Sequence, residues 1–111
     1  GSLTVERDWG WAPEYVVAMW LMLQQEFPED FIIATGQTHS LKEFLSTAFL
    51  EVGLDWSKHV ISIPSLLRPS DIQTVSVNPQ HAKDCLGWQS RNNMHDVIRL
   101  MVAYERTKQQ Y

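Results

Sequence analysis

The sequence of 111 residues lacks the paired cysteines and histidines that mark disulfides and many metal sites. It has one cysteine, Cys85, and four scattered histidines, His39, His59, His81 and His95. A single cysteine excludes a disulfide within the chain, and no CxxC or HxxxH motif with metal-ligand spacing occurs. We therefore expect no metal site, and we expect no histidine to act as an acid or base.

The chain also lacks an excess of basic residues and a long hydrophobic run. Nine Lys and Arg residues stand against 13 Asp and Glu residues, and the resulting net charge of −4 argues against nucleic acid as a partner. The longest apolar stretch, Tyr15 to Leu23, is far shorter than a bilayer-spanning helix, and no signal-peptide pattern precedes it. We therefore expect no membrane partner and a cytoplasmic location.

Aromatic and aliphatic residues are abundant by contrast. The chain is 44% hydrophobic and contains five Trp, four Phe and three Tyr residues, which is enough for one small core. No internal repeat, linker or low-complexity tract divides the sequence. We therefore expect a single domain over residues 1–111.

The first half of the chain carries two helix signals. Pro13 suits a first helical turn, and the apolar residues after it cover nearly every face, which predicts a helix over residues 13–25 that is buried on most sides. Ser40 and Glu43 have the spacing of a capping box, and helical periodicity follows. This pattern predicts a second helix over residues 41–52.

The second half carries two more helix signals. Asn78-Pro79 resembles an N-cap followed by a proline in the first turn, and it predicts a short helix that Gly87 terminates. Asn92 or Asn93 is expected to cap a last helix. The apolar face of that helix is formed by Met94, Val97, Ile98, Met101 and Val102.

Short extended segments complete the pattern. Residues 2–9 predict one or two short extended segments, and the apolar run 31–35 predicts a buried strand. Residues 59–63 predict another strand, and residues 65–77 predict a loop with an extended part. The fold class expected from these elements is α/β, with helices around a few short strands.

Short motifs of the sequence, taken in their order, resemble one known family. They are Gly1-Ser2-Leu3, Arg7-Asp8-Trp9-Gly10, the helical run from Tyr15 to Gln25, Ala34-Thr35-Gly36, His39-Ser40, Glu43-Phe44, Arg68-Pro69 and Leu86-Gly87-Trp88. From Gly1 to about Glu105 the chain resembles the C-terminal region of the GDP-mannose 4,6-dehydratases, which are extended short-chain dehydrogenases/reductases. The resemblance implies a small C-terminal substrate-binding domain.

The resemblance also implies an activity and a cofactor for the full-length family. Its members are lyases that convert GDP-mannose to GDP-4-keto-6-deoxymannose in GDP-fucose and deoxysugar biosynthesis, using NADP bound to an N-terminal Rossmann domain. The catalytic Thr, Glu and Tyr-x-x-x-Lys of the family lie in that domain as well. This chain has no glycine-rich dinucleotide fingerprint, and its single Tyr-x-x-x-Lys match, Tyr104 and Lys108, lacks the required strand–turn–helix context. We therefore expect no catalytic and no cofactor-binding residue in this chain.

Arg7 is the first candidate substrate-binding residue. A guanidinium is always charged and can hold phosphate oxygens with two parallel hydrogen bonds. The residues alone also permit a plain surface pair of Arg7 with Asp8 or Glu6. The resemblance implies instead that Arg7 lies against the nucleotide diphosphate.

Arg68 and Asp71 are the other candidates. Pro69 restricts Arg68 to an extended conformation, and a carboxylate can accept hydrogen bonds from a ribose hydroxyl or a guanine N–H. A solvated turn with a local ion pair is the alternative. The resemblance implies that Arg68 and Asp71 reach the nucleotide end of the substrate. The family has Glu at the position of Asp71, and the Asp side chain is one methylene shorter.

Two functional hypotheses follow. In the first, the chain is part of a GDP-mannose 4,6-dehydratase that binds GDP-mannose or GDP, is inactive alone, and requires a Rossmann domain in cis or in trans. In the second, it is a stand-alone remnant that serves as a binding or oligomerisation module and forms homo-oligomers. A fragment of another nucleotide-sugar epimerase or reductase is a third possibility.

Overall fold

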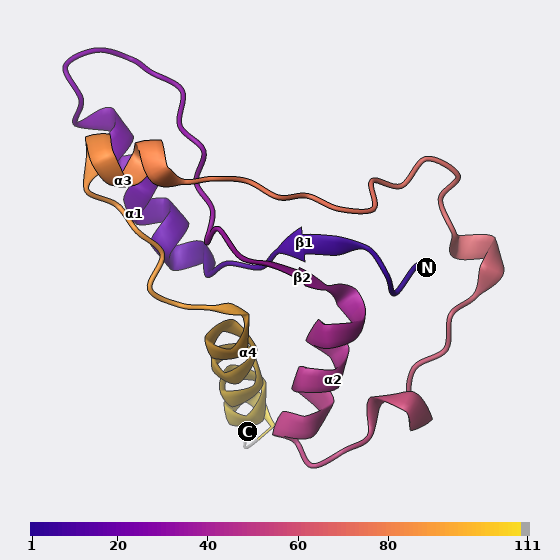
Figure 1. The fold of residues 1–111 in the computed structure, drawn as a ribbon. Helices are drawn as coiled ribbons and strands as arrows, with labels where there is room; N and C mark the ends of the chain where they lie inside the picture. Colours follow the sequence, from indigo (N-terminus) through magenta and orange to yellow (C-terminus); the bar gives the residue numbers. More distant parts are fainter. Residues whose placement is uncertain (110–111) are drawn as a thin grey trace.

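A computed structural model describes residues 1–109, and it shows four α-helices and two short strands in that range (Figure 1). Two single-turn 3-10 helices, η1 and η2, lie in the long connection between the second and third α-helices. The elements in chain order are β1 Glu6–Asp8, α1 Ala12–Leu23, β2 Thr38–Ser40, α2 Leu41–Glu51, η1 Trp56–Lys58, η2 Pro64–Leu66, α3 Gln80–Leu86 and α4 Met94–Lys108.

A small sheet at the centre joins distant parts of the chain. β1 and β2 are antiparallel, with Arg7 opposite His39. The segment that leads back toward α3 runs along the other edge of β1, where the Glu6 N–H donates to the Gln73 carbonyl at 2.6 Å and the Val75 N–H donates to the Glu6 carbonyl at 3.2 Å. β1 therefore holds the long connection in place beside residues 6–8.

The four predicted helices are present within a few residues of their expected bounds. Ser40 caps α2 by accepting from the Glu43 N–H at 3.1 Å, but the Glu43 carboxylate pairs with His39 instead of the Ser40 backbone, so the predicted capping box is only half formed. Asn93 and Asp96 form a complete capping box at the start of α4. Gly87 ends α3 with a φ of +65°, a left-handed conformation that favours glycine.

Two predicted strands are wrong, and one was missed. Residues 31–35 and 59–63 form no strand, and the only ladder within residues 1–109 joins β1 and β2. In the first run, the Thr35 N–H donates to the Asp8 carboxylate at 3.0 Å instead of to a neighbouring strand. β2, which carries the polar sequence Thr38–Ser40, gave no strand signal.

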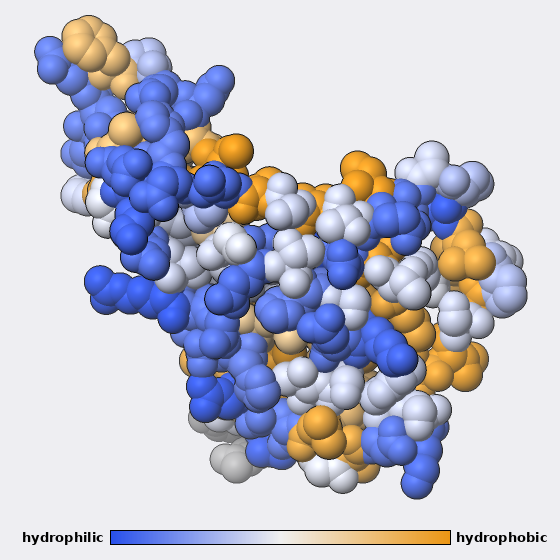
Figure 2. Space-filling view, viewed as in Figure 1, coloured by the Kyte–Doolittle hydropathy of each residue, from blue (hydrophilic) through white to orange (hydrophobic). Residues whose placement is uncertain are grey.

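The expectation that the first helix is buried on most sides is also wrong. Ala18 is fully buried against Ala82 of α3 and Trp88, but Val16, Met19, Trp20 and Leu23 are each more than half exposed, Leu23 to 82%. Apolar side chains also reach the surface elsewhere on the face seen in Figure 2. The apolar residues around α1 therefore indicate a helix whose outer side is left uncovered by residues 1–109. No helix within residues 1–109 is both long and apolar enough to cross a membrane.

The chain is less compact than a globular domain of the same length. Its radius of gyration is 16.8 Å, compared with about 13 Å for a compact domain of this size. Its accessible surface is 8194 Å², whereas a compact monomer of this mass exposes about 6,300 Å². The excess of about 1,900 Å² lies in the range that one partner buries in a large protein interface. A second core, formed by Met94, Val97 and Ile98 of α4, lies where α4 packs on α2.

Candidate functional site

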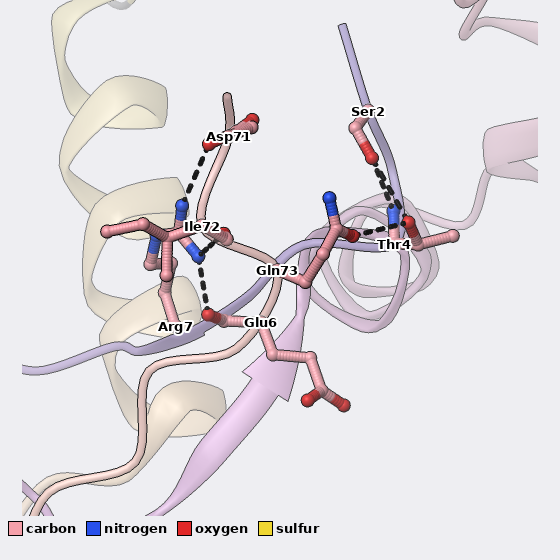
Figure 3. Close-up of polar contacts among 7 residues, drawn as sticks. All are labelled: Ser2, Thr4, Glu6, Arg7, Asp71, Ile72 and Gln73. Atoms are coloured by element: carbon pink, nitrogen blue, oxygen red, sulfur yellow. Dashed lines mark hydrogen bonds and ion pairs between the residues drawn. The ribbon is translucent and has the colours of Figure 1, made fainter. Parts of the chain in front are cut away.

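Arg7 lies at the junction of β1 and the returning segment 71–73 (Figure 3). Its Nη1 donates to the Glu6 carbonyl at 2.7 Å and to the Ile72 carbonyl at 2.8 Å. Its Nη2 donates to Oδ1 of Asp71 at 3.2 Å, so the ion-pair partner of Arg7 is Asp71, not Asp8 or the Glu6 carboxylate. The structure thus joins two of the three sequence-predicted site residues, which are 64 positions apart.

The Arg7–Asp71 pair keeps free hydrogen-bonding capacity. Three of the five N–H donors of the guanidinium are used in these contacts, which leaves two for a ligand. Asp71 uses only Oδ1 in this pair, so its Oδ2 remains able to accept a hydroxyl or N–H. The side chains are 31% and 22% exposed, so both are partly open to solvent while the pair also contributes to the fold.

Arg68 is placed differently. It lies on the exposed loop after η2, three positions before Asp71, and no hydrogen bond or ion pair holds its side chain within residues 1–109. Pro69 follows it in the sequence, and Leu67 before it has an extended backbone. Arg68 is therefore an exposed cation on the same chain segment as Asp71, free to turn toward an anionic group.

The remaining residues of the Arg-Asp-Trp motif have structural contacts. Asp8 accepts from Thr35 Oγ1 at 2.8 Å and from the Gly36 N–H at 2.8 Å, which fixes the turn that precedes β2. Trp9 packs on Phe44 of α2 and donates its indole N–H to the His39 carbonyl. The motif thus presents one residue to the candidate site and uses the next two to position β1.

Tyr15 of α1 lies close to the same region of β1. Burial raises the pKa of its hydroxyl, and the negative charge of Asp8 raises it further, so the phenol stays protonated at neutral pH. Its ring covers Gly10, where a Cβ would lie 1.9 Å from the hydroxyl oxygen, and it meets Trp88 edge-on at 5.8 Å. Gly10 therefore allows Tyr15 to close the gap between β1 and α1.

A cleft of about 740 Å³ lies beside α1 and the loop after α3. Glu14 organises it, because its carboxylate accepts from Ser90 Oγ at 3.2 Å, the Arg91 N–H at 2.9 Å and the Asn92 N–H at 3.3 Å. The Trp88 indole N–H donates to the Glu14 carbonyl at 2.9 Å. Sequence reasoning missed this role of Glu14, since its partners follow it by more than seventy residues.

The described residues do not fit a dinucleotide cofactor. Pyrophosphate is typically held by the N-terminus of a helix that follows a strand through a glycine-rich turn. Here the three longer helices each carry a carboxylate in the first turn, Glu14 in α1, Glu43 in α2 and Asp96 in α4, and each would repel a phosphate. Three side chains of types that can bind a metal ion lie together at the surface: Glu29, and His81 and Cys85 of α3.

The family model and the related sequences all point to one family. Residues 1–101 match the family model described as GDP-mannose 4,6 dehydratase. Over 102 residues the chain is 41% identical to GDP-mannose 4,6 dehydratase 1 of Arabidopsis thaliana, and over an alignment 119 positions long, gaps included, it is 37% identical to the GDP-mannose 4,6 dehydratase of Homo sapiens. Each alignment covers 92% of this chain but only 28% and 32% of the relatives, so the chain spans about three-tenths of their length.

Solved structures show the same fold. A UDP-glucose 4-epimerase from Thermotoga maritima, solved with UDP-glucose, matches 97% of this chain and 34% of its own with a TM-score of 0.84 and 23% identity. A dTDP-glucose 4,6-dehydratase from Bacillus anthracis, solved with NAD, matches all of this chain and 34% of its own with a TM-score of 0.77 and 14% identity. The fold expected from the sequence, that of a small part of an extended short-chain dehydrogenase/reductase, is confirmed. By its match to the family model over residues 1–101, the chain belongs to the GDP-mannose 4,6-dehydratase family.

Proposed function

We propose that this chain supplies the nucleotide-sugar-binding side of a GDP-mannose 4,6-dehydratase, as one domain over residues 1–111. Membership of the family supports the substrate class. The hydride and proton transfers then belong to residues outside this chain, since no described helix start suits a dinucleotide. The chain alone is expected to bind weakly and to turn over no substrate.

The observation that carries the proposal is the contact between Arg7 and Asp71, at 3.2 Å. It brings a cation and an anion that are 64 positions apart in the sequence to one partly exposed point, and each keeps hydrogen-bonding groups for a ligand. In this arrangement the two free N–H groups of Arg7 contact the diphosphate, and Asp71 accepts from the ribose or the guanine. Arg68 closes on the phosphates from the adjacent loop.

The exposed surface supports a second covering domain. The outer side chains of α1, including Met19, Trp20 and Leu23, are exposed although apolar residues of this size normally become buried on folding. A Rossmann domain, in cis or in trans, that packs on this face would bury the excess surface and form the other wall of the nucleotide site. The same exposed face favours a second candidate function, that of a binding or oligomerisation module in which another copy covers α1.

NMR titration with GDP, UDP and GDP-mannose tests the proposed site. Because only half of a cleft is present, the dissociation constant for GDP should be about 1 mM, near −4 kcal/mol. Chemical-shift changes should centre on Arg7, Arg68 and Asp71 and weaken as salt is added. Arg68→Ala should abolish the changes, whereas Arg106→Ala, which removes an exposed arginine from the far end of α4, should preserve them.

The outcomes separate the two candidates. Chemical-shift changes at Arg7 and Arg68 that are larger with GDP than with UDP support the first candidate function, the nucleotide-sugar-binding part of a dehydratase. If millimolar GDP leaves all three residues undisturbed while the chain self-associates through α1, the oligomerisation module is favoured and the ligand site is rejected.

A further inference from the structure

Three side chains with metal-ligand chemistry converge at α3, away from the Arg7–Asp71 pair. His81 and Cys85 lie one turn apart on the same face of the helix, at i and i+4. Glu29 reaches them from the loop between α1 and β2, and its Oε1 is in hydrogen-bond contact with Nε2 of His81. One ligand atom from each residue lies within 4.8 Å of the other two.

The distances in this cluster agree with a tetrahedral zinc ion. Zinc binds sulfur at about 2.3 Å and nitrogen at about 2.0 Å, so two such ligands at the tetrahedral angle lie about 3.5 Å apart. Cys85 Sγ lies 3.8 Å from Nε2 of His81, the nitrogen that Glu29 also contacts, and 3.5 Å from Nδ1. The carboxylate of Glu29 must retreat slightly from hydrogen-bond contact, and it can do so because Glu29 and His81 are each 52% exposed.

The surroundings favour a cation and hold the imidazole. Phe31 stacks on the His81 ring with centroids 5.1 Å apart and an interplanar angle of 18°, which limits the orientation of the ring. Glu26 and Asp30 lie in the same short segment as Glu29 and add negative charge to it. Cys85 is exposed, so a metal ion can reach its sulfur from solvent.

We propose that Glu29, His81 and Cys85 form a Zn²⁺ site with three protein ligands and a fourth position open to water. The combination of thiolate, imidazole and carboxylate suits zinc, whereas Mg²⁺ and Ca²⁺ require oxygen ligands. On binding, Cys85 releases its thiol proton to solvent, and the thiolate and carboxylate together neutralise the charge of the ion. The ion cross-links the loop after α1 to α3.

This proposal departs from the sequence-based expectation of no metal site. Two of the donors have the four-residue spacing of a helical metal pair, but one is His and the other Cys, so they form neither a CxxC nor an HxxxH motif. The third donor lies 52 positions from His81, and only the fold brings it near. A His–Cys pair alone would be a weak site.

Zinc binding to the 111-residue chain is measured by competition with a chromogenic chelator, and Co²⁺ serves as the spectroscopic probe. We expect one Zn²⁺ per chain, and Co²⁺ should give a thiolate-to-metal charge-transfer band with the intense visible bands of tetrahedral coordination. Loss of a supporting second-shell contact already weakens metal binding about 10- to 100-fold. Cys85→Ser, His81→Gln and Glu29→Gln should therefore each weaken Zn²⁺ binding about tenfold or more.

His95→Gln is the matched control, since His95 is another exposed helical histidine beside a carboxylate, Asp96. It should change zinc affinity less than about twofold. Circular dichroism verifies that each variant keeps its helices, which is expected because all three donors are exposed. Glu29→Gln is the decisive variant, because Glu29 is adjacent to the other donors only in the folded chain.

Alkylation of Cys85 gives an independent reading, since it is the sole thiol of the chain. Zn²⁺ should slow its reaction with iodoacetamide at least about tenfold in the wild-type chain and much less in Glu29→Gln. The proposal is overturned if Co²⁺ shows no thiolate band, if Glu29→Gln binds zinc like the wild type, or if His95→Gln weakens binding as much as His81→Gln does.

Discussion

Replacing Arg7 with lysine tests whether this residue fastens segment 71–73 to β1. Arg7 makes three hydrogen bonds at that junction: two cross to the Ile72 carbonyl and the Asp71 carboxylate, and the third goes to the Glu6 carbonyl of its own strand. Hydrogen bonds to charged groups are worth about 1.5–3 kcal/mol each when buried, and partial exposure of the pair reduces this by about half. A lysine ammonium is compact and lacks the fork of a guanidinium, so it keeps about one of the three contacts.

The loss of two such contacts is therefore expected to cost about 1.5–3 kcal/mol, which corresponds to a roughly 10- to 150-fold increase in local opening. Amide hydrogen exchange measures it directly, because the Glu6 N–H donates to Gln73 and the Val75 N–H donates to Glu6. In Arg7→Lys these two amides should exchange at least about tenfold faster. The Val97 amide in α4, bonded to the Asn93 carbonyl at 3.0 Å, should keep its rate.

Arg68→Lys is the control for this experiment, since Arg68 has no partner within residues 1–109 and its replacement should leave all of these rates unchanged. The reasoning is refuted if Arg7→Lys does not accelerate exchange at Glu6 and Val75. It is also refuted if Val97 accelerates equally, because the effect would then be global and not a loss of the local junction.

Three further predictions concern the rest of the molecule. Gly10→Ala places a methyl group 1.9 Å from the Tyr15 hydroxyl, so it should lower the free energy of unfolding by about 1–3 kcal/mol and make Trp88 more accessible in fluorescence quenching. The clash is contradicted if a Gly10→Ala/Tyr15→Ala double variant loses the full sum of the two single losses. The backbone N–H of Asn93 and the Arg99 guanidinium lower the pKa of the Asp96 carboxyl from its ordinary value of 3.8. The stabilisation that Asp96 gives to the α4 cap is therefore present above pH 3.8 and is lost as the pH falls through the lowered pKa. NMR should detect this step in the wild type and not in Asp96→Asn. The apolar surface of α1 should make the chain self-associate, and Trp20→Lys should reduce the self-association measured by sedimentation. Wild-type protein that stays monomeric at high concentration would contradict this prediction.

Local signals predicted the helices well, because their start and stop signals act over three or four residues. Asn93 with Asp96 and Gly87 after α3 illustrate this, since capping and left-handed termination depend on neighbours in sequence. The first helix shows the limit of such reasoning. Its composition predicted burial on most sides, but burial depends on what covers the helix, and the described part of the chain leaves Met19 and Trp20 more than half exposed.

Strands and site contacts depend on distant partners, and the sequence predicted them poorly. Residues 31–35 have the composition of a strand but bond to Asp8, whereas the polar residues of β2 pair with β1 because the chain brings them there. Among the site residues, Arg7 and Asp71 were identified separately from motifs. Their ion pair and the role of Glu14 in the loop after α3 appear only in the fold.

The most direct test of the central claim is a chimera with a functional relative. Residues 1–101 replace the aligned segment of the Arabidopsis thaliana GDP-mannose 4,6 dehydratase 1, with which the chain shares 41% identity. The chimera should convert GDP-mannose to its 4-keto-6-deoxy product, and Arg68→Ala within the transplanted segment should raise KM with little change in kcat, as expected for a residue that binds only the nucleotide end. A folded chimera that binds NADP but does not convert GDP-mannose, or one in which Arg68→Ala leaves KM unchanged, would contradict the account.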